Sequence, residues 1–211
     1  MVKQKITVIG AGSLGSFFLL LIAKMASAFG WEITAYDFDV VEKHNTLNQL
    51  YSNSDVGKFK VEALKNTIKS QTGREINIVN ERVNDKSGLS GIVVVLVDNM
   101  LARKEIFEAC KNNYNVTYYI EARSGGDMAS VHALDPRDPD SIELYEKTLY
   151  SDARAVPAPC ADQTTVPTLW AVATAISRLL TRTCTKKVII DEYIEVGINM
   201  SDLLSVVTKV L

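Results

Sequence analysis

Gly10-Ala11-Gly12-Ser13-Leu14-Gly15 follows directly on the apolar run Ile6-Thr7-Val8-Ile9, and together these residues decide the fold of the chain. The apolar run predicts a buried strand, residues 13–29 predict a helix, and residues 31–36 predict a second strand that ends at Asp37. This order is typical of a βαβ nucleotide-binding unit, in which the glycines allow a tight turn and a close approach of backbone to phosphate. The motif alone suits proteins that bind NAD, FAD or ATP.

Strands and helices continue to alternate as far as about residue 122. Helices are predicted for residues 58–69 and 100–111, and strands for residues 75–80, 91–97 and 116–122. The alternation predicts an α/β fold with a doubly wound, mostly parallel, Rossmann-like sheet. Beyond it the pattern changes to antiparallel C-terminal strands, and the elements predicted there are strands at 127–134 and 187–196, a short helix at 141–150 and a long apolar helix at 165–183.

Length and composition bound the class of protein. The 211 residues, 47% of them hydrophobic, suit a single domain over residues 1–211 with a well-buried core. A net charge of -2 gives no reason to expect a nucleic-acid partner, and no apolar run approaches the ~20 residues that span a bilayer. The three cysteines are widely spaced, which argues against a disulfide scaffold and against a four-cysteine zinc site. We therefore expect a cytoplasmic protein without zinc and without a membrane partner.

Four polar groups follow the predicted strand ends in order. They are the glycine loop, the segment 37–45 with Gln49 after it, the segment 55–60, and Val97-Asp98-Asn99 with Arg103 just beyond. In an open α/β sheet, ligands bind beyond the carboxyl ends of the strands. A carboxylate for ribose, a lysine for phosphate and a second carboxylate at a strand end suit ATP with Mg²⁺, which proteins usually hold by one or two carboxylates plus phosphates.

The motifs G-x-G-x-x-G, D-F-D-x-V, N-x-x-x-Q, D-x-G-x-x-K and D-N occur in this order over residues 5–125. This set closely resembles the ThiF/MoeB/ubiquitin-activating superfamily. The resemblance implies an adenylyltransferase that uses ATP and Mg²⁺ to activate the C-terminal carboxylate of a ubiquitin-like protein, a sulfur carrier or a peptide. It also implies a homodimer, or a pair formed with a homologous chain.

Carried over residue by residue, the resemblance implies a set of site residues. The phosphate and adenosine loop would contain Gly10, Gly12 and Gly15, the ribose would bind Asp37, and the nucleotide would also meet Asn45, Asn48, Gln49 and Lys60. Lys60 and Asp98 would be catalytic, with Asp98 holding Mg²⁺, and Asp39 would either help the metal or cap its loop, of which we favour the second. Cys160 would accept the activated acyl group; the alternative is a small residue packed under a proline-rich loop.

One departure concerns Asn48, which stands where the family usually has an arginine that binds phosphate. Lys43, Arg123 or Arg154 could supply the missing charge. Two other hypotheses therefore stay open beside the adenylyltransferase: a non-catalytic partner subunit, and an NAD-dependent oxidoreductase on the same fold. We favour the adenylyltransferase because both Lys60 and Asp98 are present.

The remaining reactive or unusual residues have structural explanations. Cys110 is expected in the core, Cys184 in a structural position, His44 in an exposed loop and His132 half-buried with its hydrogen bonds satisfied. Trp170 is expected in the core or a dimer interface. The segment 123–126 is expected after a strand end, where its glycines either admit a substrate tail or make a turn.

Overall fold

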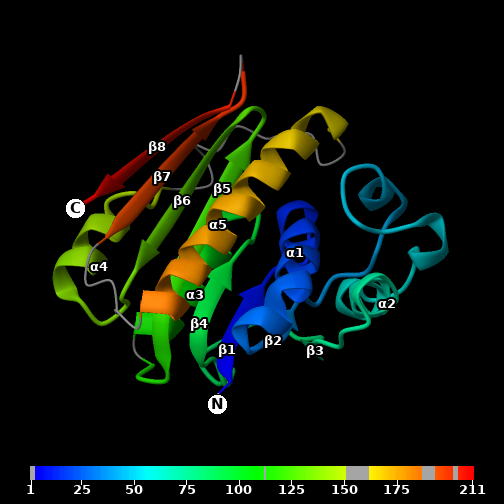
Figure 1. The fold of residues 1–211 in the computed structure, drawn as a ribbon, viewed down its shortest axis with the longest axis horizontal. Coiled ribbons are helices and arrows are strands. Elements are labelled where there is room, and N and C mark those ends of the chain that lie inside the picture. Colours follow the sequence, from blue (N-terminus) through cyan, green and yellow to red (C-terminus); the bar gives the residue numbers. More distant parts are fainter. Residues whose placement is uncertain (1–2, 112, 151–161, 187–192, 202–203) are drawn as a thin grey trace.

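The computed structural model describes residues 3–111, 113–150, 162–186, 193–201 and 204–211 (Figure 1). Eight strands form one sheet in the order β3-β2-β1-β4-β5-β6-β7-β8. The strands are β1 (Gln4–Ile9), β2 (Trp31–Tyr36), β3 (Asn77–Val79), β4 (Gly91–Val95), β5 (Val116–Gly125), β6 (Met128–Leu134), β7 (Ile194–Asn199) and β8 (Ser205–Val210). Strands β3, β2, β1, β4 and β5 run parallel, and β6, β7 and β8 continue the sheet in antiparallel pairs. The predicted mixed sheet is confirmed.

Helices cover both faces of the sheet, as a doubly wound fold requires. The α-helices are α1 (Ser13–Phe29), α2 (Lys60–Thr72), α3 (Met100–Lys111), α4 (Pro139–Glu146) and α5 (Val166–Lys186). Helices α1, α2 and α5 share one apolar core with one face of the sheet, and α3 and α4 pack on the other face. Figure 1 shows α1 and α5 side by side across the first face. None of the helices in the described segments is long and apolar enough to cross a membrane.

Local chemistry sets the element boundaries. Gly30 and Gly73 take left-handed conformations that end α1 and α2, which is the usual use of glycine after a helix. Helix α2 begins at Lys60 rather than at residue 58, because Phe59 is extended and pairs with Val40. Helix α4 begins at Pro139, because the Asp138 carboxylate accepts a hydrogen bond from the Ser141 backbone N–H.

In the second half of the chain, one prediction is wrong and a strand boundary differs. Residues 123–125 do not follow a strand end but belong to β5, which continues to Gly125 because the antiparallel partner β6 takes up its backbone hydrogen bonds. The tight turn between β5 and β6 instead contains Gly126, whose φ of 59° lies in the left-handed region. The strand predicted at 187–196 is β7, beginning at Ile194, and residues 187–192 lie outside the described segments.

Candidate nucleotide site

The first two strands and β4 bring three of the predicted groups to one edge of the sheet. In the parallel register, Ile9 lies opposite both Tyr36 on β2 and Val95 on β4. The glycine loop, Asp37 and Asp98 therefore all follow the carboxyl ends of neighbouring strands. This edge lies between β1 and β4, where the strand order reverses, and such switch points are where α/β sheets bind ligands.

The three glycines of the loop have different surroundings. Gly10 has a φ of 100°, and a Cβ placed there would lie 2.6 Å from the carbonyl oxygen of Leu96. A Cβ on Gly15 would overlap the carbonyl oxygen of Gly10, so this glycine lets α1 pack against the loop. Gly12, in contrast, has a negative φ, and no atom lies within 4 Å of an added Cβ. No neighbouring atom requires a glycine there, so the open space beside it is available to a ligand.

Asp37 is fixed to the glycine loop. Its carboxylate accepts hydrogen bonds from the backbone N–H groups of Ala11 at 2.6 Å and Asp39 at 2.8 Å. Burial raises the pKa of Asp37, while these two hydrogen bonds and the charge of Lys60 partly offset the shift. A carboxylate has about four acceptor positions, so the two that remain can accept hydroxyl donors.

Lys60 reaches the same edge from the first turn of α2. Its side chain is only 10% exposed, and its ammonium lies 2.8 Å from the Asp39 carboxylate. The Asp39 side chain therefore pairs with this lysine instead of capping its loop, which corrects the role we favoured for it. An ammonium has three donors, so Lys60 can hold Asp39 and still bind a phosphate oxygen.

Tyr51 lies at the candidate site, although it was not predicted from the sequence. Its hydroxyl donates a 2.6 Å hydrogen bond to the Ala11 carbonyl, and the side chain is buried beside the glycine loop. Burial, with the nearby charges of Asp37 and Asp39, raises its pKa well above the ordinary value. The sequence carries little signal for it, because the loop after β2 also contains Phe38 and several aliphatic residues.

The amide side chains of the following loop have mainly structural contacts. Asn45 is buried, and its Oδ1 accepts from the Glu42 backbone N–H at 2.8 Å in a capping box. Asn48 Nδ2 lies 3.5 Å from the Asp162 carbonyl. Within the described segments, the buried oxygens Asn48 Oδ1 and Gln49 Oε1 have no hydrogen-bond partner. These uncharged amide oxygens do not supply the positive charge of the arginine that is missing at Asn48.

Asp98 is exposed, and its carboxylate accepts only a 3.2 Å hydrogen bond from the neighbouring Asn99 among the contacts the structure describes. Asn99 in turn caps α3 through the Ala102 backbone N–H at 2.8 Å. No three His, Cys, Asp or Glu side chains gather into a metal cage anywhere in the described part of the chain. A metal at Asp98 would need oxygens from a ligand, which is the way Mg²⁺ binds with nucleotide phosphates.

Two expected cations are engaged elsewhere. Arg103 is buried in an ion pair with Glu121 and does not face the site. Arg123 lies 2.8 Å from the same carboxylate and donates to the Thr148 carbonyl at 2.8 Å, so it cannot replace the missing arginine as we had considered. Lys43 is exposed in the short helix Lys43–Thr46, and Arg154 lies outside the described residues.

The cysteines and histidines follow their predicted structural roles where the structure describes them. Cys110 is buried, which raises its pKa to about 12, and Cys184 accepts a hydrogen bond from Trp31 Nε1 at 3.2 Å. His132 is more buried than expected and contacts the Tyr193 hydroxyl at 2.6 Å. His44 is exposed as expected, and Cys160 lies outside the described residues.

Trp170 is 39% exposed on α5, and its ring packs against Phe17 with the ring centroids 5.0 Å apart. It lies at the margin of the core rather than inside it.

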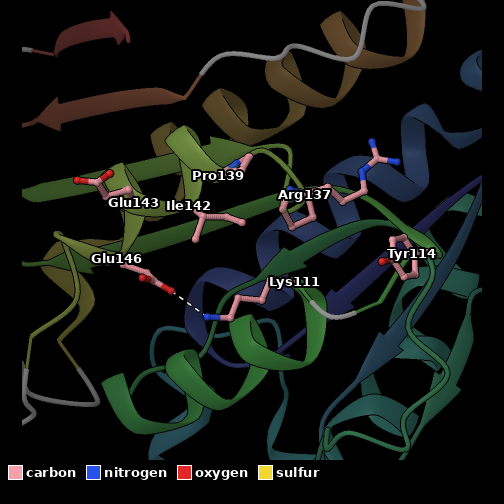
Figure 2. Close-up of a pocket in the computed structure, with 8 residues that line it drawn as sticks. Lys111, Tyr114, Arg137, Pro139, Ile142, Glu143 and Glu146 are labelled. Atoms are coloured by element: carbon pink, nitrogen blue, oxygen red, sulfur yellow. Dashed lines mark hydrogen bonds and ion pairs between the residues drawn. The ribbon is translucent and has the colours of Figure 1, made fainter.

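A groove of about 540 Å³ lies between the last turn of α3 and α4 (Figure 2). Lys111 there is 2.9 Å from Glu146, and Arg137 is 2.6 Å from Asp135. Both cations are thus matched by carboxylates. Because Lys111 ends α3 and Met100 begins it, the groove lies one helix length, roughly 16 Å, from the edge that carries Asp98. The groove is therefore separate from the edge that carries the predicted site residues.

Comparison with known proteins supports the fold and gives the family. Solved structures with this fold include PaaA (21% identity, TM-score 0.71), MccB of E. coli (21%, 0.71) and E. coli MccB with ATP (20%, 0.70). Each match covers 98% of this chain and 64%, 62% and 63% of those chains, so this chain spans less than two thirds of their length. Among curated protein sequences, none matches significantly. The model of the ThiF family matches residues 1–199, and the chain belongs to the ThiF family.

Proposed function

We propose that the chain is an adenylyltransferase that uses ATP and Mg²⁺ to activate the C-terminal carboxylate of a ubiquitin-like protein, a sulfur carrier or a peptide. A carboxylate oxygen attacks the α-phosphorus of ATP while the bond from that phosphorus to the bridging oxygen breaks. Pyrophosphate leaves, and an acyl-adenylate remains. The E. coli MccB structures with ATP, and with AMPCPP and MccA, agree with this proposal.

The observation that carries the proposal is the open side of Gly12 next to Asp37 and Lys60. Because a Cβ would meet nothing at Gly12, a phosphate can approach the backbone there and reach the free N–H groups at the start of α1. The fit to ATP rests on this cradle, on a carboxylate with spare acceptor positions and on an ammonium with spare donors.

Each residue has a separate role in the proposal. Asp37 accepts the ribose hydroxyls, and Lys60 and the start of α1 offset the charge that builds up when two anions react. Asp98 supplies a carboxylate for Mg²⁺, which when bound withdraws charge from the phosphates. Asn45 contributes only its amide nitrogen, because its oxygen is engaged in the capping box.

Cys160 as the acceptor of the acyl group rests on the sequence alone. The family resemblance also leads us to expect a homodimer or a pair with a homologous chain. We expect the chain to bind ATP at this edge of the sheet. We expect the carboxylate substrate to bind beside the ATP at the same edge.

A second candidate function is a non-catalytic partner subunit. The specific observation in its favour is that Arg103 and Arg123 are both tied to Glu121, so neither takes the place of the arginine missing at Asn48. Phosphoryl transfer is sensitive to such a loss, because an arginine that stabilises the transition state contributes about 10³–10⁵ in rate.

ATP–pyrophosphate exchange separates the two functions. The purified chain is assayed with candidate carboxylate proteins and peptides, and Lys60→Met serves as the inactive comparison. Exchange that depends on the carboxylate and on Lys60 supports the adenylyltransferase. ATP binding without exchange, restored only by a homologous chain, supports the partner subunit.

A further inference from the structure

A buried ionic cluster lies between the carboxyl end of β4 and the middle of β5, on the face that α3 and α4 cover. Glu121 on β5 is fully buried and lies opposite Val95, the last residue of β4. Arg103 and Arg123 both form ion pairs with its carboxylate. The Tyr145 hydroxyl adds a hydrogen bond at 3.3 Å. The cluster lies beside the candidate site but takes no part in the roles assigned above.

Arg103 connects this cluster to the segment that carries Asp98. One terminal nitrogen of its guanidinium donates to the Val97 carbonyl at 2.7 Å, and the other donates to the Ala122 carbonyl at 3.0 Å as well as to Glu121. Val97 is the residue directly before Asp98. The single side chain of Arg103 therefore ties α3, β5 and the end of the β4 segment together at the base of this carboxylate.

Stability alone does not explain such a cluster. Taking three charges out of water costs about as much as their attraction returns, and well-packed apolar residues of similar volume are often as stable or more stable. The cluster instead fixes the relative positions of its hydrogen-bond acceptors, because a guanidinium is a rigid planar fork that holds several acceptors in place.

We propose that Arg103, held by Glu121, is a positioning residue that fixes the backbone before Asp98 and so sets the affinity of the site for Mg²⁺ with ATP. This inference rests on the proposed function, in which Asp98 holds Mg²⁺. Groups behind a metal ligand commonly change metal affinity roughly 10–100-fold when they are altered. Arg123 supports the arrangement from the other side, since it takes up the second oxygen of Glu121.

The test measures the magnesium gain, defined as the ratio of the ATP dissociation constants in EDTA and in saturating Mg²⁺, by calorimetry. Arg103→Lys keeps the charge but loses the fork. We expect its magnesium gain to fall roughly 10–100-fold, as in Asp98→Asn, while ATP binding in EDTA is unchanged. Arg82→Lys is the matched control, because Arg82 pairs with Glu105 of the same helix on the exposed surface.

A merely structural role would weaken ATP binding equally with and without Mg²⁺, and that result overturns the inference, as does a full magnesium gain in Arg103→Lys. If Arg103→Lys does not fold, the triple variant Arg103→Met, Glu121→Leu, Arg123→Met replaces it. We expect the triple variant to melt at or above the wild-type temperature and still to lose the gain; a retained gain overturns the inference.

Different results overturn the proposed function and the role of Arg103. A wild-type chain that binds no ATP removes the proposed function, and with it this inference. A wild-type chain with a magnesium gain that Asp98→Asn abolishes but Arg103→Lys leaves intact removes the inference alone.

Discussion

Replacing Gly12 with alanine tests whether the glycine loop binds phosphate. The added methyl group meets no protein atom within 4 Å, and the φ of -73° lies outside the left-handed region that favours glycine. Gly12 is the N-cap of α1, where alanine is less favourable than glycine by about 1 kcal/mol or less, and the reduced entropy of the unfolded chain returns about 0.4–1 kcal/mol. We therefore expect the free energy of unfolding to change by less than about 1 kcal/mol.

Nucleotide binding should change much more than stability. A backbone N–H binds an acceptor oxygen at about 2.9 Å, which leaves no room for a methyl group between them. Losing one hydrogen bond to a charged phosphate costs about 1.5–3 kcal/mol. At about 1.4 kcal/mol per tenfold, Gly12→Ala should weaken ATP binding by roughly 10–150-fold. Calorimetric titration with ATP and Mg²⁺ measures the affinity, and thermal melting measures the stability.

Gly15→Ala is the matched contrast. Its Cβ would overlap the Gly10 carbonyl oxygen, so the loop or α1 must move even without a ligand. Overpacking of this kind costs about 1–3 kcal/mol, which at about 2–4 °C per kcal/mol lowers the melting temperature by roughly 2–12 °C. A phosphate contact at Gly12 is ruled out if Gly12→Ala binds ATP as tightly as the wild type, or if it loses as much stability as Gly15→Ala.

Three further predictions concern single side chains. Lys60→Met should weaken ATP binding roughly 10-fold or more, whereas the control Lys58→Met, which removes an exposed lysine two residues away, should not; equal effects would argue against a phosphate role. Burial lowers the pKa of His132 to about 4, so the unfolded chain binds the extra proton between pH 6.5 and 4 and stability falls as pH falls through this window. His132→Gln should remove about 2.4 kcal/mol of the loss between pH 7 and pH 4.5, measured by denaturant titration at each pH, and an equal loss in the variant and the wild type would contradict the assignment. Cys110, with its pKa raised to about 12, should resist iodoacetamide at pH 8 in the folded Cys160→Ala variant, and rapid labelling found by peptide mass analysis would show that it is not buried.

The sequence predicted the helix and the second strand of the first βαβ unit to the residue, whereas β1 begins at Gln4, two residues before the predicted apolar run. The predicted ranges 13–29, 31–36 and 100–111 coincide with α1, β2 and α3, because strong apolar periodicity and Gly30 determine them locally. The observed boundaries of two other elements differ from the predicted ones. Helix α2 begins later because Phe59 pairs with Val40, and β5 extends further because β6 lies beside it. Such boundaries depend on partners that are distant in sequence.

Some features of the candidate site could likewise be predicted from the sequence, and others could not. Its placement at strand ends followed from the order of the motifs, since parallel strands end at one edge. The pairing of Asp39 with Lys60 and the burial of Tyr51 depend on how the loop after β2 folds back, which no periodicity encodes. Glu121 did leave a signal, because a carboxylate inside the apolar run of β5 requires a buried partner. The sequence alone could not identify that partner as Arg103.

Whether the chain binds ATP with Mg²⁺ rather than a redox dinucleotide is tested most directly by calorimetry. The purified chain is titrated with ATP and Mg²⁺ and, separately, with NAD⁺. We expect saturable binding of ATP that strengthens with Mg²⁺, and no measurable binding of NAD⁺. Saturable binding of NAD⁺ by a chain that does not bind ATP would contradict this expectation.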